Sequence, residues 1–219
     1  MSGYIQEDLS PEELAHRARL ASSIAGSVRD LIDATVRTEV DEADIDEARR
    51  LIEAATAILR KDQLPGPFGI RFNTDGTKRS WGNAVLGRRN PIAPPVVLHH
   101  EPDVSWTEVE LGAAYEGPAG LVHGGVLALI LDQLLGSTAE YQQVPGMTGT
   151  LTVRYRKATP LGRIRGEARV DRVDGVKTFV TGTISVDGKV TAEAEGIFIL
   201  PKWARGDKSD VLRRSVGEG

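Results

Sequence analysis

The sequence lacks cysteine altogether: none occurs among its 219 residues. This absence excludes a disulfide framework, zinc sites built from thiolates and a cysteine nucleophile. It also suits a reducing compartment, so we expect a cytoplasmic protein. No apolar run approaches the roughly 20 residues that a membrane-spanning helix needs, and residues 1–10 lack the basic and then apolar pattern of a secretion signal. We therefore predict no stable insertion into a membrane.

The sequence also has no excess of basic residues. The chain has 27 Lys and Arg against 31 Asp and Glu, a formal net charge of −4. It therefore has no positive field with which to hold a nucleic-acid backbone, and we predict no nucleic-acid partner. The Gly-x-Ser-x-Gly, His-Glu-x-x-His, phosphate-loop and Gly-x-Gly-x-x-Gly patterns are also absent. This removes the signatures of serine hydrolases, zinc proteases, phosphate-loop NTPases and dinucleotide-binding enzymes.

One run, His99-His100-Glu101, looks like a metal site. Adjacent residues of a strand point to opposite faces of the sheet, so these side chains cannot all converge on one ion. We therefore predict no metal ion, and nothing in the sequence calls for another cofactor.

Residues 1–62 are predicted to form an N-terminal helical extension. The run Ser10-Pro11-Glu12-Glu13 is a helix start, in which Ser10 caps the first turn and Glu13 closes a capping box. A second helix is expected to start near Asp44, and the prolines of Leu64-Pro65-Gly66-Pro67 end it. Both helices carry an apolar stripe. We interpret them as a hairpin that lies against another surface and stabilises the fold or an oligomer, without supplying catalytic residues.

Residues 63–95 are predicted to be an irregular connection, because they contain many Gly, Pro and Asn residues and little periodicity. So long a connection suggests a lid or the wall of a binding site. Trp81, Arg88 and Arg89 stand out in it, although surface packing and solvated charge are their default roles.

From residue 96 the hydrophobic period changes to two, which is typical of strands. Asp174-Gly175 and Asp187-Gly188 separate alternating runs and predict tight hairpins. Residues 96–201 are therefore predicted to form an α+β domain, an antiparallel meander with one long helix inserted early, and residues 202–219 a polar tail. The expected strands are 96–98, 106–113, 150–155, 164–173, 176–186 and 190–200.

The inserted helix is apolar nearly all round over residues 126–135, so it is expected to be buried inside a sheet that curls around it. Asp132 interrupts this apolar surface, and a buried carboxylate is costly unless it is paired or needed at a site. Taken alone, Asp132 is as consistent with a structural role, facing a wet groove or bonding a backbone amide, as with a catalytic one.

Gly124 and Gly125 stand at the start of this helix, where the first amides lack intrahelical partners and the helix dipole is positive. Such amides can stabilise an oxyanion, although a plain turn is the alternative. Asp132 follows Gly124 by eight residues, roughly 12 Å along the axis. An elongated or cross-subunit substrate would be needed to use both. His123 is predicted to orient the turn through hydrogen bonds rather than to act as a base.

These residues occur in a longer pattern. Tyr115-Glu-Gly-Pro-Ala-Gly-Leu-Val-His-Gly-Gly, with Asp132 nine places after the histidine, resembles hotdog-fold acyl-CoA thioesterases of the phenylacetate-pathway type. Within them it is most similar to the branch called thioesterase superfamily member 4. The resemblance continues through residues 147–157 and 159–162 and covers roughly residues 96–200. It leaves the helical extension unexplained.

The resemblance implies a curved antiparallel sheet around the central helix, assembled as a homodimer or a dimer of dimers. It also implies that Asp132 is the base or nucleophile, that the Gly124 amide contacts the thioester carbonyl, and that Thr148 of the partner subunit holds the lytic water. The residues that it implies for substrate binding are Gly125, Arg154, Gly175, Val176 and Lys177.

The resemblance therefore implies an enzyme of fatty acid metabolism that hydrolyses acyl-CoA thioesters to free acid and CoA. Gly124 polarises the carbonyl, Asp132 activates water, Thr148 positions that water and His123 braces the turn. The alternative is a hotdog domain that binds acyl-CoA as a sensor without turnover. A hotdog dehydratase is less favoured, because its paired acid and histidine are missing. The sequence does not define the acyl chain.

Overall fold

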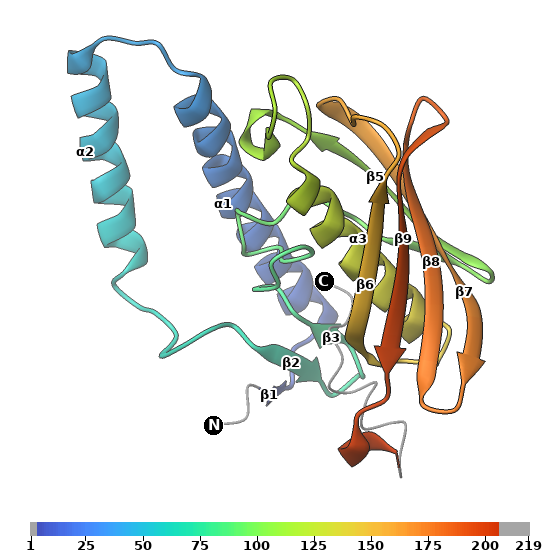
Figure 1. Ribbon diagram of the computed structural model, residues 1–219. Coiled ribbons are helices and arrows are strands. Elements are labelled where there is room, and N and C mark those ends of the chain that lie inside the picture. Colours follow the sequence, from blue (N-terminus) through green and yellow to red (C-terminus); the bar gives the residue numbers. More distant parts are fainter. Residues whose placement is uncertain (1–3, 206–219) are drawn as a thin grey trace.

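The computed structural model describes residues 4–205, without the side chains of Tyr4 and Trp203. Its main body is a six-stranded antiparallel sheet in the order β4-β5-β7-β8-β9-β6, curved around helix α3, Gly124–Tyr141 (Figure 1). The predicted α+β class and hotdog arrangement are confirmed. The strands are β4 His99–Glu101, β5 Val104–Leu111, β6 Met147–Tyr155, β7 Gly162–Asp174, β8 Lys177–Val186 and β9 Lys189–Ile199.

The two predicted hairpins are present. Asp174 pairs with Lys177, so Gly175 and Val176 form the turn between β7 and β8, and Gly175 has a positive φ of 56°. Asp187 and Gly188 connect β8 to β9 with φ values of 49° and 73°. Two successive positive φ values belong to a type I′ turn, which matches the twist of its strands. This local chemistry explains why the meander could be predicted.

The core lies between α3 and the concave face of the sheet. Leu131, Leu134 and Leu135 of α3 are fully buried, and each such leucine contributes about 1.5–3 kcal/mol by leaving water. Two strand glycines allow the close approach: a Cβ atom at Gly182 would lie 2.6 Å from the Leu135 side chain, and one at Gly196 would lie 3.0 Å from it.

One predicted strand is wrong. Residues 96–98 do not belong to the sheet, the Val96 N–H donates to the Pro94 carbonyl, and the strand begins at His99 instead. Pro94 and Pro95 precede this segment, and proline supplies no N–H for a sheet ladder. Val96 and Leu98 pack against the core without joining the sheet.

The N-terminal region contains helices α1, Pro11–Arg37, and α2, Glu42–Leu59. The capping box of Ser10 and Glu13 is present, whereas α2 begins two residues earlier than predicted because Asp41 caps it by accepting from the Asp44 N–H. Short strands β1, Tyr4–Glu7, β2, Ile70–Asn73, and β3, Lys78–Arg79, form a separate sheet. The connection is thus not wholly irregular.

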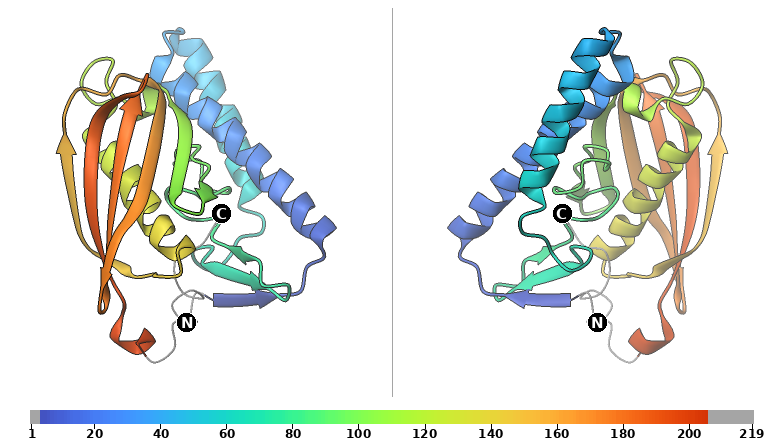
Figure 2. Two further views of the ribbon diagram at one scale, coloured as in Figure 1. Left: turned by 90° about the vertical axis from the view of Figure 1, so that its right-hand side faces the viewer. Right: turned by 90° about the vertical axis from the view of Figure 1, so that its left-hand side faces the viewer.

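The two helices differ in what they contact. Ala21 and Ala25 of α1 are buried, and Arg29 donates to the carbonyl oxygens of Ala93 and Asn90. No residue of α2 is buried. Figures 1 and 2 show α2 on the far side of α1 from the sheet. The expected hairpin therefore lies against the body through α1 only. Within residues 4–205, no helix combines the length and apolar character needed to cross a membrane.

Candidate active site

The start of α3 is built by His123 and the two glycines after it. His123 is the N-cap residue, and its Nδ1 accepts a hydrogen bond of 2.9 Å from the Gly125 N–H. The His123 N–H in turn donates to the carbonyl of Tyr115 at 2.9 Å. Within the described chain no residue accepts from the Gly124 N–H. His123 therefore accepts from the amide of Gly125, whereas the amide of Gly124 stays available for a ligand.

Tyr155 completes this end of the site. Its hydroxyl donates to the Gly124 carbonyl at 2.7 Å, and a Cβ atom at position 124 would lie 3.2 Å from the tyrosine ring. Glycine at position 124 thus lets the ring of an edge-strand residue reach the helix start. Tyr155 is not among the predicted site residues, because its place in an alternating strand does not reveal which turn of the helix it contacts.

The second part of the site is Asp132 with Thr148. The Thr148 hydroxyl donates to Asp132 Oδ1 at 2.9 Å. Asp132 is half-buried and Thr148 is exposed, so water can reach the pair. The carboxylate is therefore less enclosed than the apolar sequence around it suggests.

The resemblance implies that Thr148 of the partner subunit completes the site, and this assignment stays a prediction. The hydrogen bond between Thr148 and Asp132 described above forms within one chain. Strand β6 lies at the edge of the sheet beside β9 and contacts α3, and its register shifts between Thr148 and Thr150. Such a bulge re-aims the side chains next to it.

The amide and the carboxylate lie on the same helix but apart. Eight residues of α3 separate Gly124 from Asp132, which corresponds to roughly 12 Å along the axis. One thioester carbonyl cannot contact both within a single chain. A site that uses both groups must combine two chains or bend the substrate along the helix.

The residues predicted to bind CoA fall into two places. Lys177 is in register with Ile199, and Ile199 with Met147, so the hairpin of Gly175 and Val176 lies toward the Thr148 end of β6. Arg154 lies at the other end, roughly 20 Å away at the rise of a strand. There it pairs with Glu195 at 2.6 Å, and this hydrogen bond raises the pKa of the guanidinium.

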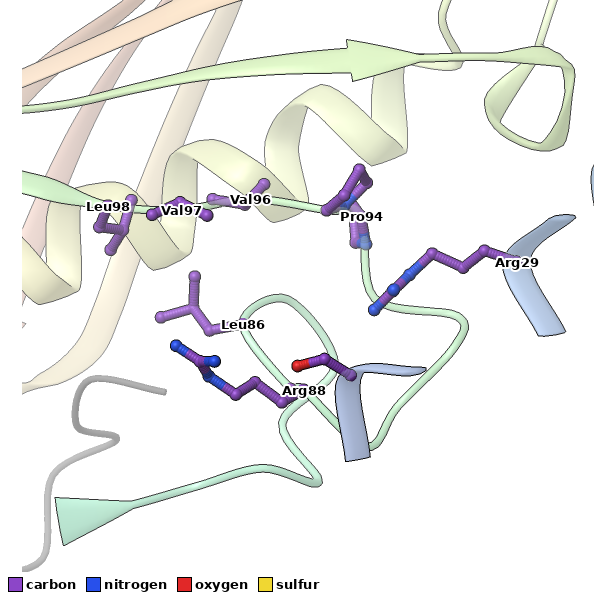
Figure 3. Close-up of a pocket in the computed structure, with 10 residues that line it drawn as sticks. Arg29, Leu86, Arg88, Pro94, Val96, Val97 and Leu98 are labelled. Atoms are coloured by element: carbon purple, nitrogen blue, oxygen red, sulfur yellow. The ribbon is translucent and has the colours of Figure 1, made fainter. Parts of the chain in front are cut away.

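A pocket of about 390 Å³ lies between α1 and the segment before β4 (Figure 3). Its wall is mainly apolar, with Val96, Val97 and Leu98 running alongside α3 and Leu86 opposite them. Arg29 and Arg88 also line it. The connection thus forms one wall of a cavity, and it also reaches the helix, because Asn83 donates to Gln133, the residue after Asp132, at 3.4 Å.

The histidine pair behaves as predicted for adjacent strand residues. The His99 ring stacks on Trp106 at 4.1 Å, whereas the His100 ring stacks on Tyr141 at 4.7 Å. In the part of the chain that the structure describes, no three His, Asp or Glu side chains converge as metal ligands.

Comparison with known proteins identifies the class. Residues 119–193 match the family model described as thioesterase superfamily. A crystal structure of a thioesterase superfamily protein is 31% identical and has a TM-score of 0.73, over 82% of this chain and 94% of that one. The chain therefore belongs to the thioesterase superfamily.

Curated relatives show which members of the superfamily the chain resembles. The acyl-coenzyme A thioesterase THEM4 of Xenopus laevis is 35% identical over 91 residues, which are 40% of this chain and 41% of that protein. The protein of the same name from Mus musculus is 36% identical over 91 residues, 40% of this chain and 39% of its own length. The chain thus spans about two fifths of the length of these relatives, and the predicted resemblance is confirmed.

Proposed function

We propose that this protein hydrolyses acyl-CoA thioesters to a free acid and CoA. The observation that carries the proposal is the water-accessible Asp132 carboxylate, oriented by the Thr148 hydroxyl at 2.9 Å on a helix whose first amide is unengaged. A carboxylate beside a hydroxyl can accept a proton from water, and a free helix N-terminal amide can stabilise an oxyanion. The names of the curated relatives support the same substrate class.

The proposed reaction uses these groups in sequence. The Gly124 N–H donates to the thioester carbonyl, while Asp132 takes a proton from the water that Thr148 positions. The resulting hydroxide bonds to the carbonyl carbon, and the tetrahedral oxyanion then collapses. The carbon–sulfur bond breaks, and the leaving CoA thiolate takes the proton held by Asp132, which restores the carboxylate. His123 acts by holding the glycine turn. Attack by Asp132 itself, through an anhydride, is the alternative use of the same carboxylate.

A homodimer is part of the proposal, because of the distance along α3. We place the Gly124 amide of one chain opposite the Asp132–Thr148 pair of a second. The nine-residue strand β6 supports such pairing, since it is the exposed edge of the sheet, and an edge strand presents unpaired backbone groups. A dimer of dimers is the alternative assembly.

For the substrate, we assign the acyl chain to the apolar pocket of Figure 3. The CoA moiety is assigned to Arg154 and to the hairpin of Gly175, Val176 and Lys177. These lie at opposite ends of β6, and we place them around one CoA from two different subunits. Gly125 would contact substrate through its Cα, because His123 holds its amide. A cytoplasmic role in fatty acid metabolism also stays a prediction.

The decisive experiment is a panel of short, medium, long and aromatic acyl-CoAs with detection of the free thiol. We expect thiol release with at least one class, and at least about a hundredfold slower release in Asp132→Asn. Stoichiometric binding of acyl-CoA without thiol release would instead establish the sensor function. Neither binding nor release across the panel would contradict both.

A further inference from the structure

A second pocket, of about 240 Å³, lies where α1 faces β2 and β3, and it shares no lining residue with the site described above. Four arginines from four segments converge on it, and we call it the arginine pocket. Arg17 comes from α1, Arg71 from β2, Arg79 from β3 and Arg89 from the connection. In a chain with a net charge of −4, such a concentration of positive charge is local and requires an explanation.

Among residues 4–205, a single carboxylate lines the arginine pocket. Glu7 Oε1 accepts from Arg71 Nη1 at 2.7 Å and lies 3.8 Å from Arg17 Nη1, while Oε2 accepts from Arg79 Nη2 at 2.5 Å. Both oxygens of this carboxylate are therefore in use. The charges of the pocket-lining residues sum to about +3, since four guanidinium groups face a single carboxylate.

The inner two arginines are poorly compensated. The side chains of Arg71 and Arg79 are only 12% and 3% exposed. The Nε atoms of both are buried without a hydrogen-bond partner among the described residues. Burial of charged donors without partners is unfavourable, because water no longer solvates them. A bound anion would supply the missing negative charge.

Two other carboxylates lie near enough to influence these arginines but are engaged elsewhere. Glu13 accepts from the Ser10 N–H in the capping box of α1. Asp75 accepts from the Thr77 N–H in the turn before β3. Neither lines the pocket.

The other walls of the arginine pocket are aromatic and apolar. The rings of Phe68 and Trp81 stack at 5.9 Å, and the guanidinium groups of Arg71 and Arg89 lie over the Phe68 ring at 4.4 and 5.4 Å. Leu20 and Ile24 of α1 line the same pocket and are 58% and 45% exposed. The pocket thus offers an apolar and planar surface next to its positive charge.

We propose that the arginine pocket binds a small organic oxyanion, a phosphate or carboxylate carried on a planar or apolar body. Guanidinium groups match both anions, because their paired N–H groups fit two oxygens at once. Arg17 and Arg89 are exposed at the mouth of the pocket and make the first contacts. The body of the ligand lies on Phe68, Leu20 or Ile24. The inference does not rest on the proposed hydrolysis.

Isothermal titration calorimetry of the full chain tests this with three probes at constant ionic strength. Inorganic phosphate reports on the oxyanion alone, adenosine 3′,5′-bisphosphate adds an aromatic body, and decanoate adds an apolar one. We expect one-to-one binding of at least one organic probe, more tightly than inorganic phosphate. A tighter bisphosphate identifies a nucleotide-like ligand, and a tighter decanoate identifies a fatty carboxylate.

Substitutions locate the binding. Arg17→Ala and Arg89→Ala should each weaken it by about tenfold or more, since each removes a charged donor. Arg19→Ala is the matched control, because Arg19 is an exposed arginine of the same helix that does not line the pocket, and it should leave binding unchanged. The absence of binding by all three probes, or equal affinity in the wild type and the two pocket variants, would overturn the proposal. Because turnover is not measured, neither result bears on hydrolysis.

Discussion

The contact between Thr148 and Asp132 shows which roles of single residues could be predicted from the sequence and which could not. Asp132 was recognisable as a carboxylate within an apolar helix, and His123 as a residue that orients a turn. The hydrogen bond between Thr148 and Asp132 of the same chain could not be predicted, because it depends on β6 pairing with β9 and on the bulge after Thr148. Strand order is set by contacts distant in sequence, and the hydrophobic period along one strand does not contain it.

Substitution of Asp132 by Asn tests its role as the base. The amide keeps the shape of the carboxylate but cannot accept a proton from water. General-base contributions are typically about a hundred- to ten-thousand-fold, so turnover should fall by at least a hundredfold while substrate still binds. The melting temperature should be unchanged or slightly higher, because a half-buried charge is replaced by a neutral group. Unchanged thioester cleavage would leave Asp132 with a structural role only.

Thr148 offers a matched pair of substitutions. Thr148→Val removes the hydroxyl that donates to Asp132 and keeps the branched shape, whereas Thr148→Ser keeps the hydroxyl. Loss of one such hydrogen bond in the transition state corresponds to about a tenfold slower turnover. We expect this loss for valine and near wild-type rates for serine in the same thiol-release assay. Equal rates for the two variants would argue against a role for the hydroxyl.

At the scale of elements, helix starts and turns could be predicted from neighbouring residues, whereas pairings between distant segments could not. The capping box of Ser10 and the two Asp-Gly turns fixed a helix start and two hairpins, because each is decided within a few residues. The pairing of Tyr4–Glu7 with Ile70–Asn73 joins segments more than 60 residues apart. Neither four-residue strand has an alternating pattern long enough to predict it.

The small sheet should respond to acid through Glu7. Burial alone would raise the pKa of this carboxyl, but the hydrogen bonds and charges of Arg71 and Arg79 outweigh it and lower the pKa. A lowered pKa stabilises the fold above the unfolded value of about 4.3, and this contribution is lost as the pH falls through the folded value. The free-energy difference between wild type and Glu7→Gln should therefore be constant near neutrality and shrink toward zero in acid. Thermal unfolding of both proteins between about pH 7 and about pH 3 measures this free-energy difference. A difference independent of pH would contradict the assignment.

Helix α2 is the element with the least support within one chain. Leu51 and Ile58 of its apolar stripe are 62% and 63% exposed, whereas most helical stability in proteins comes from packing of the apolar face. If a second chain covers the stripe, Leu51→Gln with Ile58→Gln should lower the melting temperature and weaken self-association in sedimentation. Ala57→Gln, on the opposite side of the helix, should change neither. Unchanged or improved stability in the double variant would mean that the stripe faces solvent.

At the scale of the whole molecule, the two halves of the site raise the question of how many chains build it. The family and fold followed from a motif of local spacing, whereas the assembly depends on surfaces that no single-chain pattern describes. Residues Gly124 and Asp132 both belong to α3, yet their separation of roughly 12 Å exceeds the reach of one carbonyl group. We therefore expect an obligate dimer, and an active monomer in sedimentation at assay concentration would contradict it.

Mixed dimers decide between a shared site and a site within one chain. Gly124→Ala places a methyl group 3.2 Å from the Tyr155 ring and disturbs the Gly124 amide. Asp132→Asn removes the base. Each variant alone should therefore be nearly inactive. If each site joins Gly124 of one chain to Asp132 of the other, a mixed dimer has one site with both lesions and one intact site. Random exchange of the two variants, after co-unfolding or co-expression, should then restore about a quarter of wild-type turnover, because about half of the dimers are mixed and each has one working site. If the site lies within one chain, every site in every mixture carries a lesion and no activity returns. Mixing either variant with itself is the matched control, and activity that returns there would show repair of the single variant rather than complementation.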